Sequence, residues 1–180
     1  SFLPLSFFIP YAVPAVIATL MWGYLYGPAY GPLTQVADAL SLPRPEFFSA
    51  GAILPSIANI AVWEYMGYNM IIYVAALQSI PQDLEEASMM DGASAFAYAA
   101  KIKLPMIVPT IIVTIIFSII GTLQLFAEPY LMINLARNVI STSYTPNIYA
   151  YTLAFTAQQI NYSAAISFVL GGVVAVVSYV

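Results

Sequence analysis

Long stretches of this chain contain no charged residue. Residues 1–37, 104–127 and 138–180 carry none, and the 180-residue sequence has only four Lys or Arg and eight Asp or Glu. A soluble domain needs about a quarter of its residues charged to cover its surface. A helix of about 20 apolar residues, by contrast, crosses a hydrocarbon core about 30 Å thick. The sequence therefore predicts an all-α, polytopic membrane protein.

Four regions are long and apolar enough to cross a membrane once each. They are 2–26, 50–79, 106–133 and, within 148–180, the segment SAAISFVLGGVVAVVSYV. Prolines near the start of the first region are tolerated where neighbouring helices satisfy the freed carbonyl groups. The tyrosine-rich YAYTLAFTAQQINY is predicted to lie at the membrane surface, and LTQVADALSLPRPEFF to form a short helix and loop outside the hydrocarbon. With neither a first methionine nor a basic leader, the sequence is expected to lack one or two N-terminal helices and a C-terminal tail.

Cysteine and histidine are absent, which excludes disulfides, thiol nucleophiles and the usual zinc ligands. Outside one charged segment the carboxylates are scattered, which disfavours an integral membrane enzyme, the alternative from another functional class. No G-x-x-x-x-G-K-S/T motif is present, and no basic patch suggests a nucleic-acid partner. We therefore predict no catalytic residue, no metal site and no cofactor in this chain.

Six of the charged residues lie between the second and third spans, in the segment 81–105. Pro81 suits a first helical turn, and the carboxylates that follow it are favoured by the helix dipole. An Asp-Gly pair predicts a helix end, because Gly92 can adopt a positive φ. A second short helix is predicted for 93–101, and the next span starts at Pro105. The segment 81–105 would then form a helix-turn-helix elbow that projects between the two spans. Composition alone fits an elbow with a specific role and an ordinary surface loop equally well.

The spacing within this elbow is specific. It reads Glu86-Ala87-Ser88, three residues, Gly92, nine residues, Ile102, one residue, Leu104-Pro105. This pattern resembles the coupling motif of the inner-membrane permease subunits of binding-protein-dependent ABC importers, with serine replacing the last alanine of its Glu-Ala-Ala start. Further spans of that family resemble LPLSFFIPYAVPAVIATLMWGYLYGPAYGPL, VWEYMGYNMIIYVAALQSIPQDL, LQLFAEPYLM and YAYTLAFTAQQINYSAAISFVL. The resemblance covers nearly the whole chain and is to the carbohydrate branch, of the maltose and glycerol-phosphate type.

The resemblance implies a single MetI-like, type I permease domain over 1–180, a helical bundle with about four spans, and a cytoplasmic coupling elbow at 81–105. In such permeases the elbow docks into a groove of the ATP-binding subunit. That placement determines the orientation of the spans. The positive-inside rule leaves this orientation open, because two lysines on one side of the membrane balance two arginines on the other. The loops 30–48 and 134–147 then face the extracytoplasmic side. The implied coupling residues are Glu85, Glu86, Ala87, Ser88, Asp91, Gly92 and Ala93.

Polar groups inside a span tend to face a wet path. Thr114, Ser118 and Thr122 share one face of the third span, although small residues of this kind also pack helix against helix. By resemblance, the substrate pathway comprises Glu64, Tyr65, Tyr68, Ser118, Gly121, Thr122 and Leu125. Their aromatic faces and hydrogen-bonding groups suit a sugar. Glu64 could instead pair with a neighbouring permease subunit.

The predicted function is that of the membrane-spanning subunit of an ATP-driven sugar importer. A neutral oligosaccharide is favoured because the spans contain no Lys or Arg that would bind a phosphate. The alternative within transport is a glycerol phosphate ester, an amino acid or a peptide. The implied partners are a second permease subunit, a cytoplasmic ATP-binding dimer that holds ATP and magnesium, an extracytoplasmic solute-binding protein, the sugar and the lipid bilayer. The implied location is the plasma or inner membrane of a bacterium or archaeon.

Overall fold

The regular elements of the chain are helices. The computed structural model describes residues 3–179, and no strand occurs within them. The helices are α1 (Leu3–Phe8), α2 (Ala15–Leu25), α3 (Pro32–Ala39), α4 (Ile53–Gln78), α5 (Gln82–Met90), α6 (Ala95–Tyr98), α7 (Leu104–Leu123), α8 (Ala127–Met132), α9 (Pro146–Tyr151) and α10 (Ile160–Tyr179). The all-α prediction is confirmed. Phe2 and Val180, at the predicted ends of the first and last spans, lie outside the described residues.

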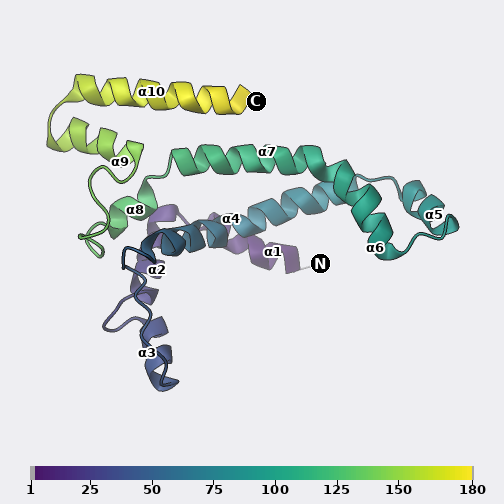
Figure 1. Ribbon diagram of the computed structural model, residues 1–180, viewed down its shortest axis with the longest axis horizontal. Coiled ribbons are helices and arrows are strands. Elements are labelled where there is room, and N and C mark those ends of the chain that lie inside the picture. Colours follow the sequence, from purple (N-terminus) through teal and green to yellow (C-terminus); the bar gives the residue numbers. More distant parts are fainter. Residues whose placement is uncertain (1–2, 180) are drawn as a thin grey trace.

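Three helical segments in the described part of the chain are long and apolar enough to cross a membrane. They are Ile53–Gln78, Ala95–Met132 and Ile160–Tyr179, and the bent pair α1 and α2 makes a fourth if it counts as one span. The predicted number of about four spans is thus confirmed. α7 packs against both α4 and α10, and Figure 1 shows these three helices side by side. α5 and α6 project at one end of α4 and α7, while α8 lies at the other end (Figure 1).

The first predicted span is not one continuous helix. Its two parts, Ser6–Ala12 and Ala15–Leu25, meet at an angle of 106°. Between them Val13 and Pro14 are extended, with ψ of 127° and 135°. The proline ring keeps the residue before it out of the helical region, so the helix ends at this point. The expectation of an unbroken helix through the prolines is wrong here, because the chain turns at Pro14.

The third predicted span also divides. α7 ends at Leu123, and Phe126, with φ of −139°, turns the chain into α8. The last carbonyl groups of a helix need partners from elsewhere. Asn147, from the first turn of α9, donates its Nδ2 to the Gln124 carbonyl at 2.7 Å. Because this partner comes from the tertiary fold, the local sequence does not predict where the helix ends.

The last region divides as the sequence predicts. α9 continues into a π-helical turn, Thr152–Thr156, and Gln158 adopts a φ of 55° before α10 starts. α9 packs against α10. The tyrosine-rich segment is therefore a separate element from the last spanning helix.

The buried core joins α2, α4 and α8 at the end opposite the elbow. It consists of Tyr26, Ile53, Ile57, Ile60, Met132, Ala136 and Ile140. The Tyr26 ring stacks on Phe47 with centroids 4.3 Å apart, and its hydroxyl accepts a 2.8 Å hydrogen bond from Asn59 Nδ2. Ser56 Oγ donates to the Phe47 carbonyl at 2.9 Å. These contacts fix one end of α4, the helix that carries three of the seven predicted pathway residues.

Candidate functional site

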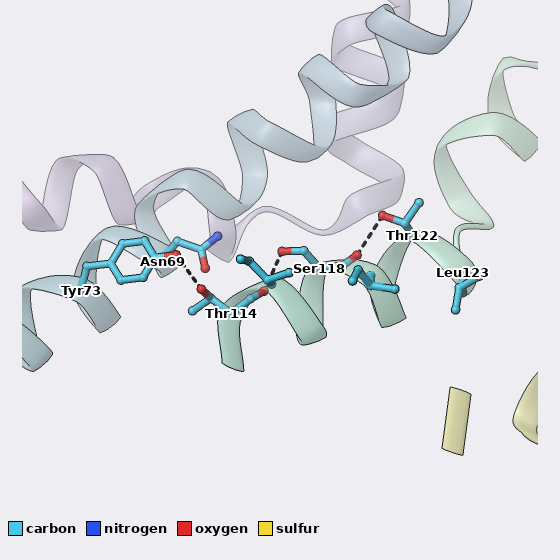
Figure 2. A pocket seen from close by; sticks show the side chains of 8 residues that line it. Asn69, Tyr73, Thr114, Ser118, Thr122 and Leu123 are labelled. Carbon is cyan, nitrogen blue, oxygen red and sulfur yellow. Dashed lines mark hydrogen bonds between the residues drawn. The ribbon is translucent and has the colours of Figure 1, made fainter. Parts of the chain in front are cut away.

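A cavity of about 360 Å³ lies between α4 and α7. α4 contributes Asn69 and Tyr73, and α7 contributes Thr114, Ile115, Ser118, Ile119, Thr122 and Leu123. Figure 2 shows the hydroxyl side chains spaced along α7, with Tyr73 directed toward Thr114. The volume falls in the range of about 300–1,000 Å³ in which small-molecule sites lie. The cavity combines apolar walls with a few polar groups, as such sites do.

The hydroxyl groups of α7 are bonded to their own helix. Thr114 Oγ1 donates to the Ile111 carbonyl at 2.8 Å, Ser118 Oγ to Thr114 at 2.9 Å and Thr122 Oγ1 to Ser118 at 2.8 Å. Ser and Thr within a helix commonly satisfy their hydroxyls in this way. Thr114 is 4% exposed and lies 2.6 Å from the Tyr73 hydroxyl. This hydrogen bond is a polar link between α4 and α7 at the wall of the cavity.

Only part of the predicted pathway set lies together at this cavity. Ser118 and Thr122 line it, whereas Gly121 and Leu125 do not. Leu125 packs against the buried core instead. Asn69 and Tyr73 line the cavity although the predicted set omits them. The spacing Tyr65, Asn69, Tyr73 places all three on one helical face, and this pattern would have identified them.

The two predicted tyrosines of α4 contact the first span. The Tyr68 ring stacks on Tyr11 at 4.9 Å, and the Tyr65 ring meets Tyr11 edge-on at 5.8 Å. Tyr65 also connects to the cavity, because Asn69 Nδ2 donates to its carbonyl at 3.2 Å. The pathway residues of α4 are therefore divided between a hydroxyl-lined cavity and an adjacent aromatic contact. No sequence pattern pointed to Tyr11.

Glu64 does not line the cavity. The residue is 5% exposed, and its carboxyl group interacts with that of Glu128 of α8, which is 7% exposed. The sequence predicts that Glu64 either lines the substrate pathway or pairs with a neighbouring permease subunit. Within the described chain its partner is an intrachain carboxyl group.

The elbow begins and turns where the sequence predicts. Pro81 precedes α5, and Gly92 adopts a φ of 77°. L-amino acids rarely adopt this conformation, whereas glycine, which has no Cβ, does so readily. The Ala93 amide donates to the Ser88 carbonyl at 2.9 Å, which closes the turn. Ser94 Oγ then caps α6 by accepting from the Ala97 amide at 3.2 Å.

The second part of the elbow differs from the prediction. α6 covers only Ala95–Tyr98 and passes through a π-helical turn, Ala99–Lys103, directly into α7. The predicted separate helix at 93–101 is therefore the first part of one continuous helical path into the span. Lys103 Nζ lies 3.6 Å from Glu85 Oε2 and 4.7 Å above the Tyr98 ring. These contacts hold α5 against the base of α7.

The predicted coupling residues divide by exposure. Glu86, Ala87, Asp91 and Gly92 are exposed, and Glu85 and Ala93 are half-buried. Ser88 is 6% exposed, and its hydroxyl donates to the Glu85 carbonyl at 2.8 Å. The serine that replaces an alanine of the motif thus satisfies its polar group inside the elbow. It leaves the outer surface of α5 unchanged. The roles of these residues in coupling stay predictions.

An ion pair closes the loop after α3. Arg44 binds Asp38 through two hydrogen bonds of 2.8 and 2.9 Å, and Ser41 between them has a φ of 54°. The hydrogen bonds and the charge of Asp38 raise the pKa of Arg44. Both side chains are exposed, so the pair shapes the loop more than it stabilises the fold.

Comparison with known proteins gives a family match. The family model described as "Binding-protein-dependent transport system inner membrane component" matches residues 2–180. The diacetylchitobiose uptake system permease protein NgcF of Streptomyces coelicolor is 31% identical over 177 residues, which cover 96% of this chain and 50% of that protein. The lactose transport system permease protein LacF of Rhizobium radiobacter is 39% identical over 118 residues, covering 65% of this chain and 40% of that protein. The chain spans about half the length of the curated relatives it matches.

A similar fold occurs among solved structures. A chain of a bacterial ABC transporter involved in the import of the acidic polysaccharide alginate superposes with a TM-score of 0.82 and 24% sequence identity. The match covers 94% of this chain and 59% of that chain. The helical arrangement described above is thus shared with a transporter subunit.

Proposed function

Because this chain belongs to the family of binding-protein-dependent transport system inner membrane components, we propose that it forms one half of the membrane pathway of an ATP-driven sugar importer. The observation that carries this proposal is the position of the hydroxyl-lined cavity. The two helices that line it, α4 and α7, are the two that flank the elbow. A displacement of the elbow therefore acts directly on both walls of the cavity.

Three relatives support a sugar as the solute. Their names assign them diacetylchitobiose, lactose and trehalose, the last in Mycobacterium tuberculosis at 29% identity over 96% of this chain. The cavity fits this class chemically, since a sugar needs apolar surface for its C–H groups and hydrogen-bonding groups for its hydroxyls. Hydroxyl and amide side chains alternate with isoleucine and leucine along its walls.

A neutral sugar is favoured over an anionic solute. One relative is an sn-glycerol-3-phosphate permease protein from Shigella flexneri, 29% identical over 96% of this chain. Binding of a phosphate would call for Arg or Lys in the pathway. The four basic residues of this chain, at positions 44, 101, 103 and 137, all lie outside α4, α7 and α10. The phosphate ester is therefore the second candidate.

The proposed mechanism couples the elbow to the cavity. ATP binding to two partner subunits would draw the elbows of this chain and a second permease subunit together. Because α6 continues into α7 and only three residues separate α4 from α5, the walls of the cavity follow this movement. Two states with different affinity for nucleotide and for solute are what such coupling requires. ATP and magnesium would bind to the partner, and this chain is a non-catalytic subunit.

The remaining partners follow from the same proposal. The loops at the end opposite the elbow, including the Asp38–Arg44 loop, would face an extracytoplasmic solute-binding protein. One solved neighbour is in complex with an alginate pentasaccharide-bound periplasmic protein. The chain is a multi-pass membrane protein, and we place it in the plasma or inner membrane of a bacterium or archaeon.

Uptake by the complete transporter tests the proposal. The full-length protein, its partner subunits and its solute-binding protein are reconstituted in liposomes with ATP inside or outside, and radiolabelled lactose, trehalose and diacetylchitobiose are offered. We expect ATP-dependent accumulation of at least one sugar, reduced several-fold by Thr122→Val without loss of assembly. Ser178→Ala serves as the control, because the Ser178 hydroxyl donates to the Val174 carbonyl within α10 and Ser178 does not line the cavity. Accumulation of glycerol phosphate and of no sugar would overturn the choice of solute.

A further inference from the structure

The helical path from the elbow into the third span has an irregular joint. α6 passes through the π-helical turn Ala99–Lys103 into α7 without a break. Pro105, the second residue of α7, has no amide proton, and in a regular α-helix its ring would clash with the carbonyl four residues earlier. Here the Leu104 amide instead donates to the Ala99 carbonyl, five residues earlier. Such π-helical turns lie frequently at functional sites. The path is therefore irregular at the point where a movement of the elbow has to reach α7.

The first helix of the elbow, α5, has little packing of its own. No extensive contact joins α5 to another helix within the described part of the chain. Its last residues, Met89 and Met90, are 61% and 89% exposed. Three residues connect α5 to α4, and four connect it to α6. Because short links of this kind can bend, side-chain contacts determine whether α5 moves together with α7.

One basic side chain connects α5 to this joint. Lys103, the last residue of the π-helical turn, places its Nζ 3.6 Å from Glu85 Oε2 and 4.7 Å from the centre of the Tyr98 ring. We call these three residues the elbow brace. Tyr98 is 5% exposed, whereas the side chains of Lys103 and Glu85 are 35% and 39% exposed. An exposed ion pair alone contributes little, but an ammonium group that also faces an aromatic ring gains a second attraction.

The two neighbouring glutamates of the elbow differ in direction. Glu86 is exposed, whereas the Glu85 carboxylate is paired with Lys103 inside the chain. Ser88, almost one turn after Glu85, is 6% exposed and donates to the Glu85 carbonyl. Glu85 and Ser88 therefore belong to the inner side of the elbow. Glu86 remains on its outer surface.

We propose that Lys103 is a positioning residue for the coupling of ATP hydrolysis to transport. Through Glu85 and Tyr98 it holds α5 against the base of α7, so that a displacement of the elbow moves the cavity wall and does not bend the joint. The inference rests on the proposed function as an ATP-driven importer. It assigns the Glu85 carboxylate to the elbow brace and not to the surface that docks to the ATP-binding subunit. Loss of the brace should let ATP hydrolysis continue while less sugar is transported per ATP.

The test measures sugar accumulated per ATP hydrolysed by the complete transporter in liposomes, with its solute-binding protein. Radiolabelled lactose, trehalose and diacetylchitobiose are the probes. We expect Glu85→Gln and Lys103→Met each to lower this ratio about two- to fivefold. The double variant should lower it no further, because both changes remove the same contact.

Two further variants are the controls of this measurement. Lys103→Arg keeps a cation over the Tyr98 ring and beside Glu85, and it should leave the ratio unchanged. Lys101→Met removes the other lysine of the same π-helical turn, which is exposed and forms no ion pair with the described residues. This variant should also leave the ratio unchanged. Melting temperature and co-purification of the ATP-binding subunit should stay normal in all of these proteins.

Other roles for these side chains would give other results. If Glu85 contacts the ATP-binding subunit directly, Glu85→Gln would lower the ratio and the co-purification, and Lys103→Met would be normal. If the brace only stabilises the elbow, melting temperature, co-purification and ATPase rate would fall together with transport. Either outcome overturns the proposal, as do additive losses in the double variant.

The remaining outcomes separate the brace from the proposed function. If Lys103→Met fails to assemble, Glu85→Gln decides, since glutamine keeps the size of the side chain and removes only its charge. A normal ratio in Glu85→Gln then refutes the brace and leaves the importer intact. If the unaltered transporter accumulates no sugar, the proposed function fails, and the inference fails with it.

Discussion

Gly67 is the position at which the packing of the first span is most sensitive to substitution. A Cβ at this position would lie 1.8 Å from the Phe7 carbonyl oxygen, 2.3 Å from its carbonyl carbon and 2.8 Å from the Phe8 Cα. Carbon and carbonyl oxygen normally approach to about 3.3 Å, so α1 would have to withdraw by about 1.5 Å. All three neighbours are backbone atoms, so no side-chain rotation relieves the clash. Overpacking of this kind costs about 1–3 kcal/mol, against about 1 kcal/mol that alanine gains in helix propensity.

The overpacking cost exceeds the gain in helix propensity by up to about 2 kcal/mol. We therefore expect Gly67→Ala to lower the stability of the protein by up to this amount, which corresponds to about 4–8 °C in melting temperature for a chain of this size. Thermal unfolding of the purified transporter, followed by size-exclusion chromatography after heating, measures the shift. Gly171→Ala is the matched control, because an added Cβ there meets nothing within 4 Å. If the melting temperature of the Gly67→Ala protein equals or exceeds that of the unaltered protein, α1 and α4 do not cross at this distance.

Three further sets of substitutions test the elbow, the cavity wall and the buried carboxyl pair. Gly92→Val should reduce co-purification of the ATP-binding subunit and uptake, since valine is strained by about 1–2 kcal/mol at a left-handed φ; unchanged coupling would remove the elbow from the mechanism. Thr114→Val and Tyr73→Phe should each lower the stability by about 1 kcal/mol, and the double variant should lose little more, because both changes remove the same hydrogen bond. If the losses measured by thermal unfolding are additive, this hydrogen bond contributes nothing. Glu64→Ala leaves the Glu128 carboxyl buried without its partner and should cost about 1–3 kcal/mol more than Glu64→Gln; equal melting temperatures would contradict the pairing.

Local signals predicted the elbow well and the spans less well. Pro81 and Gly92 act through their own backbone conformations, so sequence alone locates the start and the turn of α5. Pro14 acts in the same local way, yet membrane helices often tolerate proline, and the sequence does not reveal whether neighbouring helices will bridge it. The end of α7 depends on Asn147, a partner 23 residues away. Such long-range hydrogen bonds leave no periodic pattern to read.

The candidate site was predicted in part. Ser118 and Thr122 line the cavity because the four-residue spacing of polar groups in an apolar helix defines a face. Glu64 does not line the cavity, because a resemblance transfers the place of a residue but not the direction of its side chain; its role in the pathway stays a prediction. Tyr11 escaped notice since its contact depends on the bend after it. No periodic pattern in the sequence predicts that bend.

The hydroxyl ladder of α7 also determines which hydrogen-bonding groups the cavity offers. Each of Thr114, Ser118 and Thr122 directs its proton to a backbone carbonyl. Thr114 Oγ1 therefore receives the proton of Tyr73, and Asn69 directs an amide proton to Tyr65. The cavity wall thus offers mostly hydrogen-bond acceptors, and a bound solute has to supply the donors. A polyol carries a hydroxyl donor on nearly every carbon, whereas a phosphate dianion carries no donor and would meet a wall that offers mainly acceptors.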